Sequence, residues 1–153
     1  MKLLEKLKQR CRHFLDRICD KPTPFHDASK VTRFINSKKA IKRGNDGKLT
    51  STPDAFMYPK TEPELSLAHI DKLNSEKIWA IGDNRVFRKA AKKTIARADM
   101  KVSELKACAF DNFTIIRDNA EFWRHVTAKT SMEKQQWATQ LSLLASLFEK
   151  NIG

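Results

Sequence analysis

The sequence predicts an α+β protein: a small mixed sheet with packed helices, an amphipathic helix at the N-terminus and a long amphipathic helix at the C-terminus. Short β-branched and aromatic runs, such as residues 31–35, alternate with segments in which apolar residues recur every three or four positions. Their order is strands, then helices, a further strand and a last helix, which is typical of α+β proteins. With 153 residues, 41% of them hydrophobic, the chain is long enough for one domain with one core.

Residues 1–20 have the periodicity of an amphipathic helix. Their apolar residues fall within an arc of roughly 120°, and Lys and Arg side chains lie on both flanks of that arc. The arc consists of Leu3, Leu4, Leu7, Cys11, Phe14, Leu15 and Ile18.

The chain is expected to divide into three parts. Asp20 is followed by Pro22 and Pro24, which cannot continue a helix. We therefore expect a basic helical extension over residues 1–21, a linker over 22–30 and a single α+β domain over 31–153.

Several strands are expected in the first half of the domain. Residues 31–35 (VTRFI) are β-branched and aromatic, and residues 65–70 alternate apolar with polar side chains. Residues 38–53 contain the turn signal Asp46-Gly47, which indicates a hairpin or an exposed loop. Residues 56–58, just before a proline, are a further candidate strand.

Helices are expected in the middle of the chain. Asn74 or Ser75 can cap a short helix that runs to Ile81 and ends at Gly82. Residues 84–95 are expected to be helical, with cations on one face, and residues 103–107 are expected to form another short helix. The apolar stripe of the 84–95 helix would consist of Phe87, Ala91, Ile95 and Ala98.

The C-terminal part is expected to contain one strand and one long helix. Residues 113–117 are the candidate strand. The sequence Thr130-Ser131-Met132-Glu133 fits a capping box, so the helix should begin there and run to about Lys150. Its buried face would consist of Trp137, Leu141, Leu144, Ala145 and Phe148.

The positive charge is concentrated in separate segments. The net charge is +12, with eight Lys and Arg against three Asp and Glu in residues 22–60 and eight against two in 84–106, whereas 61–83 are net acidic. Such clustering favours a polyanionic or acidic partner, although charged runs are more often simply solvated surface. The candidate polyanion-binding residues are Lys38, Lys39, Lys42, Arg43, Arg85, Arg88, Lys89, Lys92 and Lys93.

Several function classes have little support. The three cysteines form no CxxC pair, and Cys108 lies among apolar neighbours that favour an inert thiol. The four histidines are scattered, so we expect no metal site, and without a glycine-rich phosphate loop we expect no cofactor. No apolar run reaches the roughly 20 residues of a membrane span, and we expect a cytoplasmic protein.

One set of polar residues could form a site. Arg33 and Asp99 stand in otherwise apolar segments, where a charged side chain needs a partner. A structural Arg–Asp pair would satisfy that need, and the functional alternative is a small anion pocket in which a histidine carries a proton. The candidate catalytic residues are Arg33, Ser66, Arg97, Asp99 and His125.

The N-terminal helix allows three interpretations. It could dock on the core, pair with a partner helix or with a second copy of itself, or lie on an anionic membrane. The candidate partner-binding residues are Leu3, Leu7, Phe14 and Ile18.

Several segments from residue 31 to about residue 150 resemble a small, uncharacterised bacterial protein family. The similar segments are Thr32-Arg33-Phe34-Ile35, Ala55-Phe56-Met57-Tyr58-Pro59, Glu64-Leu65-Ser66, Ile78-Trp79-Ala80-Ile81-Gly82, Ala96-Arg97-Ala98-Asp99 and Arg124-His125-Val126. The resemblance implies a bacterial or phage setting and no activity. One block departs from the pattern, because His125-Val126-Thr127 stands where the family has His-Ala-Asn.

The sequence therefore favours a basic binding or accessory module that contacts nucleic acid, or an acidic protein partner already bound to nucleic acid. One alternative is a nucleotide- or nucleic-acid-processing enzyme that uses the Arg, Asp and His candidates, and whether the protein is an enzyme stays open, with binding favoured. The other alternative is a protein-interaction module acting through residues 1–20. Steep salt dependence, convergence of the polar set in one pocket, and an exposed apolar stripe on the N-terminal helix would distinguish the three.

Overall fold

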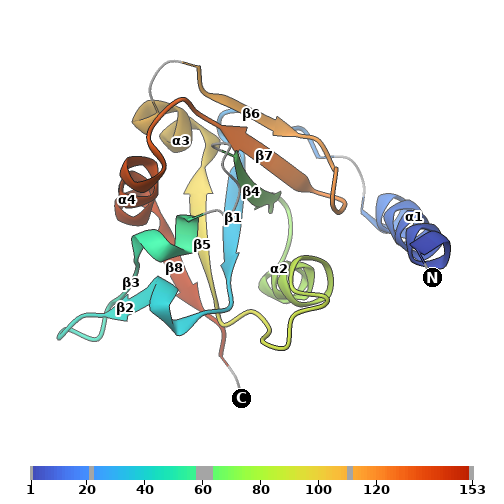
Figure 1. Ribbon diagram of the computed structural model, residues 1–153, viewed down its shortest axis with the longest axis horizontal. Coiled ribbons are helices and arrows are strands. Elements are labelled where there is room, and N and C mark those ends of the chain that lie inside the picture. Colours follow the sequence, from blue (N-terminus) through green and yellow to red (C-terminus); the bar gives the residue numbers. More distant parts are fainter. Residues whose placement is uncertain (1, 21–22, 58–63, 110–111, 152–153) are drawn as a thin grey trace.

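The computed structural model describes residues 2–20, 23–57, 64–109 and 112–151, and within them the fold is mixed helix and sheet (Figure 1). A six-stranded sheet has the order β6-β7-β4-β1-β5-β8, and neighbouring strands in it run antiparallel. Its strands are β1 (Lys30–Ile35), β4 (Glu64–His69), β5 (Ala96–Lys101), β6 (Thr114–Arg117), β7 (His125–Lys129) and β8 (Ser146–Glu149). The separate hairpin expected around Asp46-Gly47 is formed by β2 (Ile41–Arg43) and β3 (Leu49–Ser51).

The helices cover the two faces of the sheet unequally. The helices are α1 (Lys2–Cys19), α2 (Ser75–Ile81), α3 (Val102–Cys108) and α4 (Lys134–Leu144), with the short turns η1 (Lys38–Ala40), η2 (Pro53–Phe56) and η3 (Gly82–Val86). One face packs against α3, α4 and η2 around the buried Trp137 and Leu141, as their positions in the sequence predict. The other face packs a smaller cluster around Phe34 and Ile78 beneath α2.

Gly82 brings the chain close to the sheet. A Cβ at this position would collide with Thr94 Oγ1 and would lie 2.7 Å from Phe34 Cδ1. The backbone of Gly82 stays right-handed and continues from α2 into a π-helical turn that ends at Val86. The α-helix ends at Ile81 with Gly82 as its C-cap, as expected, but packing space rather than a left-handed conformation explains this glycine.

The expected helix over residues 84–95 is wrong beyond Val86, because residues 87–95 form bends, turns and irregular chain. Ile95 and Ala98 belong to the sheet instead. The Ile95 N–H donates to the Ile35 carbonyl at 2.8 Å, and Ala98 pairs with Arg33 across β1 and β5. The helical spacing of the apolar residues was coincidental, since ladder hydrogen bonds outweigh the helix propensity of alanine and lysine.

The C-terminal helix is shorter than expected. Glu133 rather than Thr130 caps α4, accepting from the N–H groups of Gln135 (2.9 Å) and Gln136 (2.8 Å). The helix ends at Leu144, and the chain then forms β8, which pairs with the outer edge of β5. Phe148 is therefore a half-exposed strand residue.

Two further expectations differ in their outcome. Phe56 lies in the turn η2 and Met57 is irregular, so the candidate strand over 56–58 is not formed there, and Tyr58 lies outside the described residues. In contrast, α2 begins after an Asn74 cap as expected, with the Asn74 side chain accepting from the Lys77 N–H at 2.9 Å.

Candidate functional site

The two basic segments lie at the same end of the sheet (Figure 1). The hairpin β2–β3 and the 87–95 segment both approach the C-terminal end of the chain. Asn36 Nδ2 donates to the Lys92 carbonyl at 3.4 Å, and the Lys150 N–H donates to the Ile95 carbonyl at 2.9 Å. We call this region the basic end; its cations are Lys38, Lys39, Lys42, Arg43, Lys48, Arg88, Lys89, Lys92 and Lys93.

Some of the candidate cations are already paired inside the molecule. Arg43 forms an ion pair with Glu149 at 3.0 Å, and Lys93 Nζ donates to the Phe87 carbonyl at 3.0 Å. Arg85 is held by both carboxylate oxygens of Asp16, at 2.9 and 2.7 Å, and so serves the attachment of α1. The exposed lysines of the basic end include Lys38, Lys39, Lys42, Lys48, Lys89 and Lys92.

Helix α1 contacts the rest of the molecule with its polar face. Asp16 pairs with Arg85, and Asp20, just past the helix, accepts from Arg124 Nη2 at 2.7 Å and from Trp123 Nε1 at 3.0 Å. Burial would raise the pKa of Asp20, but the hydrogen bond and charge of Arg124 outweigh it and lower that pKa. The carboxylate of Asp20 is therefore an ionised anchor for the end of α1.

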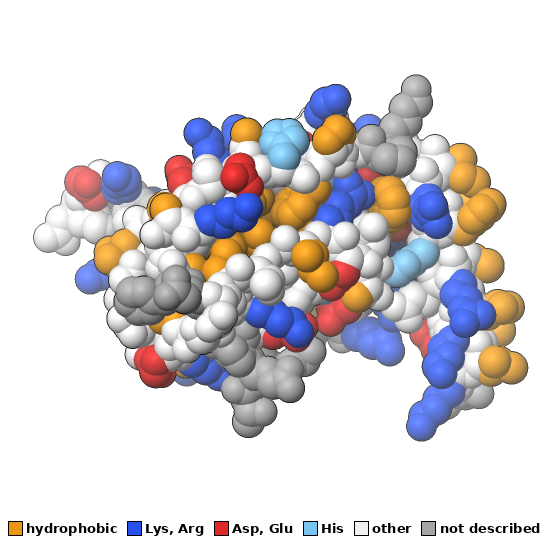
Figure 2. Space-filling view, turned by 90° about the horizontal axis from the view of Figure 1, so that it is seen from above, with side chains coloured by type: hydrophobic (Ala, Val, Ile, Leu, Met, Phe, Trp, Pro, Cys, Tyr) orange, Lys and Arg blue, Asp and Glu red, His pale blue; other side chains and the backbone are white. Residues whose placement is uncertain are grey.

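The apolar arc of α1 points away from the body. None of the helix residues is buried, and Leu3 is 81% exposed and Phe14 65% exposed. Figure 2 shows hydrophobic side chains with Lys and Arg beside them at the right-hand margin, the side on which α1 lies. Docking of α1 on the core through its apolar arc is therefore wrong. We call this surface the outer face of α1; its large exposed residues are Leu3, Leu4, Leu7, Phe14, Leu15 and Ile18.

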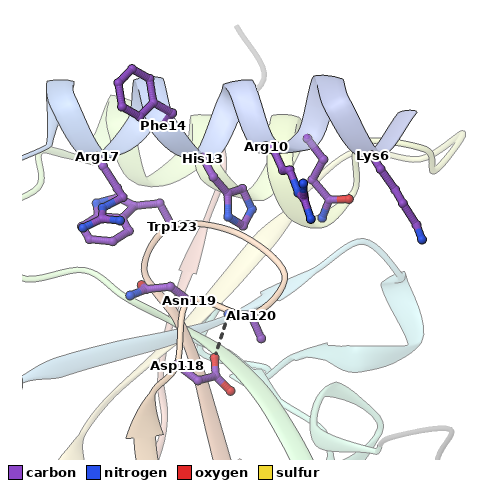
Figure 3. A pocket seen from close by; sticks show the side chains of 10 residues that line it. Lys6, Arg10, His13, Phe14, Arg17, Asp118, Asn119, Ala120 and Trp123 are labelled. Atoms are coloured by element: carbon purple, nitrogen blue, oxygen red, sulfur yellow. Dashed lines mark hydrogen bonds between the residues drawn. The ribbon is translucent and has the colours of Figure 1, made fainter. Parts of the chain in front are cut away.

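A hollow of about 820 Å³ separates α1 from the loop that joins β6 to β7 (Figure 3). The helix lines it with cations, and the loop contributes Asp118, Asn119 and Trp123. The Trp123 ring is already engaged, because the guanidinium carbons of Arg17 and Arg117 lie 5.5 and 4.6 Å from its centroid. This ring therefore serves the attachment of α1 and is occupied by cations.

Arg33 has a structural role in the sheet. The β1–β4 ladder includes the pairs Val31↔His69 and Thr32↔Ala68. One residue further along β1, Arg33 Nη1 donates to the Ser66 carbonyl at 2.9 Å and its Nε donates to the Ala55 carbonyl at 3.2 Å. The guanidinium thus ties β4 and η2 to β1, and backbone oxygens occupy these two donors.

Asp99 forms its ion pair with Arg97, whereas the sequence pointed to Arg33 and Asp99 as the charged residues that need a partner. Arg97 Nε lies 3.3 Å from Asp99 Oδ1, and both side chains are almost buried. The Arg97 guanidinium lies between the rings of Trp79 and Phe148, 4.9 and 5.0 Å from their centroids. Burial raises the pKa of Asp99, against the opposing hydrogen bond from Thr32 and the charge of Arg97. Two stacked rings and a carboxylate are a structural environment for an arginine.

Ser66 and His125 do meet, and a third residue joins them. Ser66 Oγ lies 3.0 Å from His125 Nε2, and His125 Nδ1 lies 2.6 Å from Asp118 Oδ1. Thr127 Oγ1 donates to the other carboxylate oxygen of Asp118 at 2.5 Å. The polar set therefore splits: Arg97 pairs with Asp99, Ser66 and His125 join Asp118, and Arg33 contacts Ser66 through its backbone carbonyl. Asp118 was not among the sequence candidates, because only the β6–β7 pairing brings it to His125.

His69 is a second buried histidine, and it was not among the candidate residues named from the sequence. His69 is fully buried; its Nε2 lies 2.9 Å from Asp71 Oδ2, and Arg117 Nη1 lies 3.1 Å from its Nδ1. Burial lowers the pKa of His69, and the neighbouring Asp71 offsets this only in part. Arg124 Nη1 closes the network by donating to the carbonyls of His69 (3.2 Å) and Asp71 (3.0 Å).

Other features of the described residues bear on ligand classes. No group of three or more His, Cys, Asp or Glu side chains within the described ranges is arranged to hold a metal ion. Burial raises the pKa of the Cys108 thiol, which disfavours the reactive thiolate. In the described part of the chain, no helix combines the length and apolar character needed to cross a membrane.

Comparison of the chain with protein-family models, with curated proteins and with solved structures finds no match. The function is therefore inferred from the surfaces and contacts of the molecule itself.

Proposed function

We propose that this protein is a basic binding module that contacts the phosphate backbone of nucleic acid through its basic end. The observation that carries the proposal is the meeting of the two basic segments, which are far apart in the sequence, at one end of the sheet. Each phosphate neutralised by Lys or Arg releases counterions, so a group of exposed cations gives affinity without sequence preference. Residues 38–51 contain no aromatic side chain, and residues 87–95 contain only Phe87, which is half-buried against the α2 cluster, so backbone contact is favoured over base stacking.

Charge reversal at the basic end tests this proposal. Replacing Lys38, Lys39, Lys89 and Lys92 with Glu should weaken binding to a short DNA or RNA duplex by a similar factor for every sequence. The slope of log K against log salt should flatten by about one unit for each phosphate that is no longer neutralised. Affinity measured by fluorescence anisotropy at several salt concentrations gives both quantities.

A matched control reverses charge at the opposite end of the sheet. Lys30 and Lys101 are exposed cross-strand neighbours at the far end of β1 and β5, and their replacement with Glu should leave the slope unchanged. The control reverses two charges against four, so an equal decrease in binding free energy per reversed charge would reduce the effect to net charge. An unchanged affinity after reversal of the basic end would refute the proposal.

We propose a second binding surface, the outer face of α1, with a partner helix that carries acidic residues beside its own apolar stripe. The specific observation is that α1 uses its polar face for attachment and leaves its apolar face open. Lys8 and Arg10 border this face directly, because they fall about 80° on either side of its centre at 100° per residue. Acidic flanks on the partner would complement these cations.

Self-association through this face is disfavoured by the same charges. A second copy would place Lys and Arg flanks against each other, and like charges across a helix pair are destabilising. The partner is therefore a different chain of opposite flank charge, in agreement with the net charge of +12.

A synthetic amphipathic helix with a leucine stripe and glutamate flanks is the appropriate probe. It should bind the full chain and lose affinity when Leu3, Leu7 and Phe14 are replaced with Ser. These side chains are exposed, so the melting temperature should not fall. Leu143→Ser, at an 85% exposed position on α4, is the matched control and should bind normally. A dimer in sedimentation, or binding to phosphatidylserine vesicles without binding to the peptide, would overturn the choice of partner.

A further inference from the structure

The Ser66–His125–Asp118 chain is built by the sheet itself. Ser66 pairs with Thr127 and Ala68 pairs with His125 across β4 and β7, so Ser66 and His125 are diagonal neighbours on one face. Asp118 follows the last residue of β6 and His125 is the first of β7. Three adjacent strands therefore hold the three side chains in place, with Ser66 within β4, His125 at the start of β7 and Asp118 just past β6.

The hydrogen bonds indicate which atoms of the Ser66–His125–Asp118 chain carry protons. Burial would raise the pKa of Asp118, but hydrogen bonds from Thr127, His125 and the Ala120 N–H outweigh it and lower that pKa. Figure 3 shows the Ala120 contact, which measures 3.1 Å. An ionised Asp118 favours a proton on His125 Nδ1, which leaves the Nε2 lone pair facing the Ser66 hydroxyl. This is the tautomer required of a general base.

The surroundings hold the histidine rigidly. The His125 side chain is 2% exposed, and the Phe122 ring packs edge-on against it with centroids 5.1 Å apart. Two loop residues beside the chain have left-handed backbones, Asn119 with φ 51° and Arg124 with φ 78°. Such conformations persist where contacts over-determine them, and here Arg124 is held by its bonds to Asp20 and to two carbonyls. Ser66 is half-buried, and Asp118 at the other end of the chain is exposed.

We propose that Ser66 is a nucleophile for carboxylic esters, with His125 as its general base and Asp118 as the residue that positions His125. Ser66 Oγ would form a bond to the ester carbonyl carbon while its proton passes to His125 Nε2. Collapse of the tetrahedral intermediate breaks the bond to the alcohol oxygen, and the alcohol leaves with that proton. Water then attacks the acyl-serine, gives its proton to His125 and releases the acid, which restores Ser66. This activity is independent of both binding surfaces.

A fluorophosphonate probe tests the proposal directly, because an activated serine displaces fluoride, forms a bond to phosphorus and gains the mass of the probe less HF. Wild-type protein should gain one label, and peptide mapping should place it on Ser66. Ser66→Ala should lose the label, and His125→Gln should slow labelling by about 10²- to 10⁴-fold, the usual contribution of a general base. Thr32→Val is the matched control, since it removes a buried hydroxyl that donates to the Ala98 carbonyl on the same sheet; it should label at the wild-type rate.

A conservative variant separates positioning from structure. Asp118→Asn should slow labelling of Ser66, and Asp118→Glu, which restores a carboxylate, should recover part of the rate. A variant that only loosened the fold would lower the melting temperature, and its labelling rate would not recover when the carboxylate is restored. Folded wild-type protein that gains no label on Ser66 would overturn the proposal, as would equal labelling of His125→Gln.

Discussion

Removing the carboxylate of Asp20 should cost about 3 kcal/mol of folding stability. Its partner Arg124 is 2% exposed, and loss of one member of a buried ion pair costs about 3–5 kcal/mol. The lower end of that range applies here, because Arg124 keeps the carbonyls of His69 and Asp71 as acceptors and Asp20 is a quarter exposed. For a domain of this size, such a loss lowers the melting temperature by about 6–12 °C.

Urea unfolding and thermal melting of Asp20→Ala measure this loss. The matched control is Asp27→Ala, because Asp27 pairs with Lys106 on the surface, where the two side chains are 68% and 47% exposed. An exposed pair contributes about 0–1 kcal/mol, so the control should melt within a few degrees of wild type. If Asp20→Ala has the same melting temperature as Asp27→Ala, other groups compensate the Arg124 charge, and the expected loss of about 3 kcal/mol is refuted.

A shortened chain that starts at Thr23 extends the same test. Helix α1 adds no residue to either apolar cluster, and this chain keeps Phe25 on the core, so it should fold and lose about the same 3 kcal/mol as Asp20→Ala. It should also lose the ability to bind the acidic helical peptide. A shortened chain that does not fold would show that α1 supports the core and is more than an attached binding surface.

Three further substitutions or conditions have definite expected effects. Trp137→Ala should cost about 3–5 kcal/mol in urea unfolding, because the ring is fully buried and packs edge-on against Phe113. Gly82→Ala should cost about 1–3 kcal/mol, since the new methyl would meet Phe34 and the neighbouring Thr94 hydroxyl; wild-type stability would show that this segment can shift. His69 binds a proton in the unfolded chain below about pH 6.5 but resists it when folded, so stability should fall as pH drops below 6.5, and His69→Gln should flatten this slope in urea titrations.

The sequence predicts best where the side-chain pattern and the local signals agree. The periodicity of residues 1–20 predicts α1, and Asn74 before an apolar segment predicts the start of α2. Trp137 and Leu141 are core residues as expected. In each case the information lies within a few residues of the element, so no distant contact is needed to specify it.

The sequence does not predict the strands β5, β7 and β8, and the reason is physical. β5 is alanine-rich and carries Arg97 and Asp99, a composition that favours a helix in isolation. Its strand conformation comes from hydrogen-bonded partners on both edges, β1 and β8. Neither partner is close in the sequence, so no local pattern contains the signal.

The candidate site shows the same limit. Ser66 and His125 are both in the predicted set, but their meeting depends on the β4–β7 register, and Asp118 enters only through the β6–β7 connection. The pairing of Arg97 with Asp99 follows from the strand β5, because strand residues two apart lie on one face, and the sequence did not predict that strand. Convergence across strands requires a topology that the sequence alone leaves open.

The orientation of α1 carries the strongest functional implication, because it runs against the usual energetics of an amphipathic helix. Burying one large apolar side chain contributes about 1.5–3 kcal/mol, so docking by the apolar face would have been the more stable arrangement for the isolated chain. The observed arrangement depends instead on Asp16 and Asp20, one helical turn apart on the opposite side, each matched to an arginine of the domain. These two acids hold the helix with its apolar face outward, so only a partner can bury that face.

Exchanging Asp16 and Asp20 for Asn should therefore weaken peptide binding even though neither residue lies on the outer face, because a released α1 can turn its apolar arc onto the domain. Peptide affinity unchanged by this double substitution would show that the partner, and not these two anchors, keeps the face available.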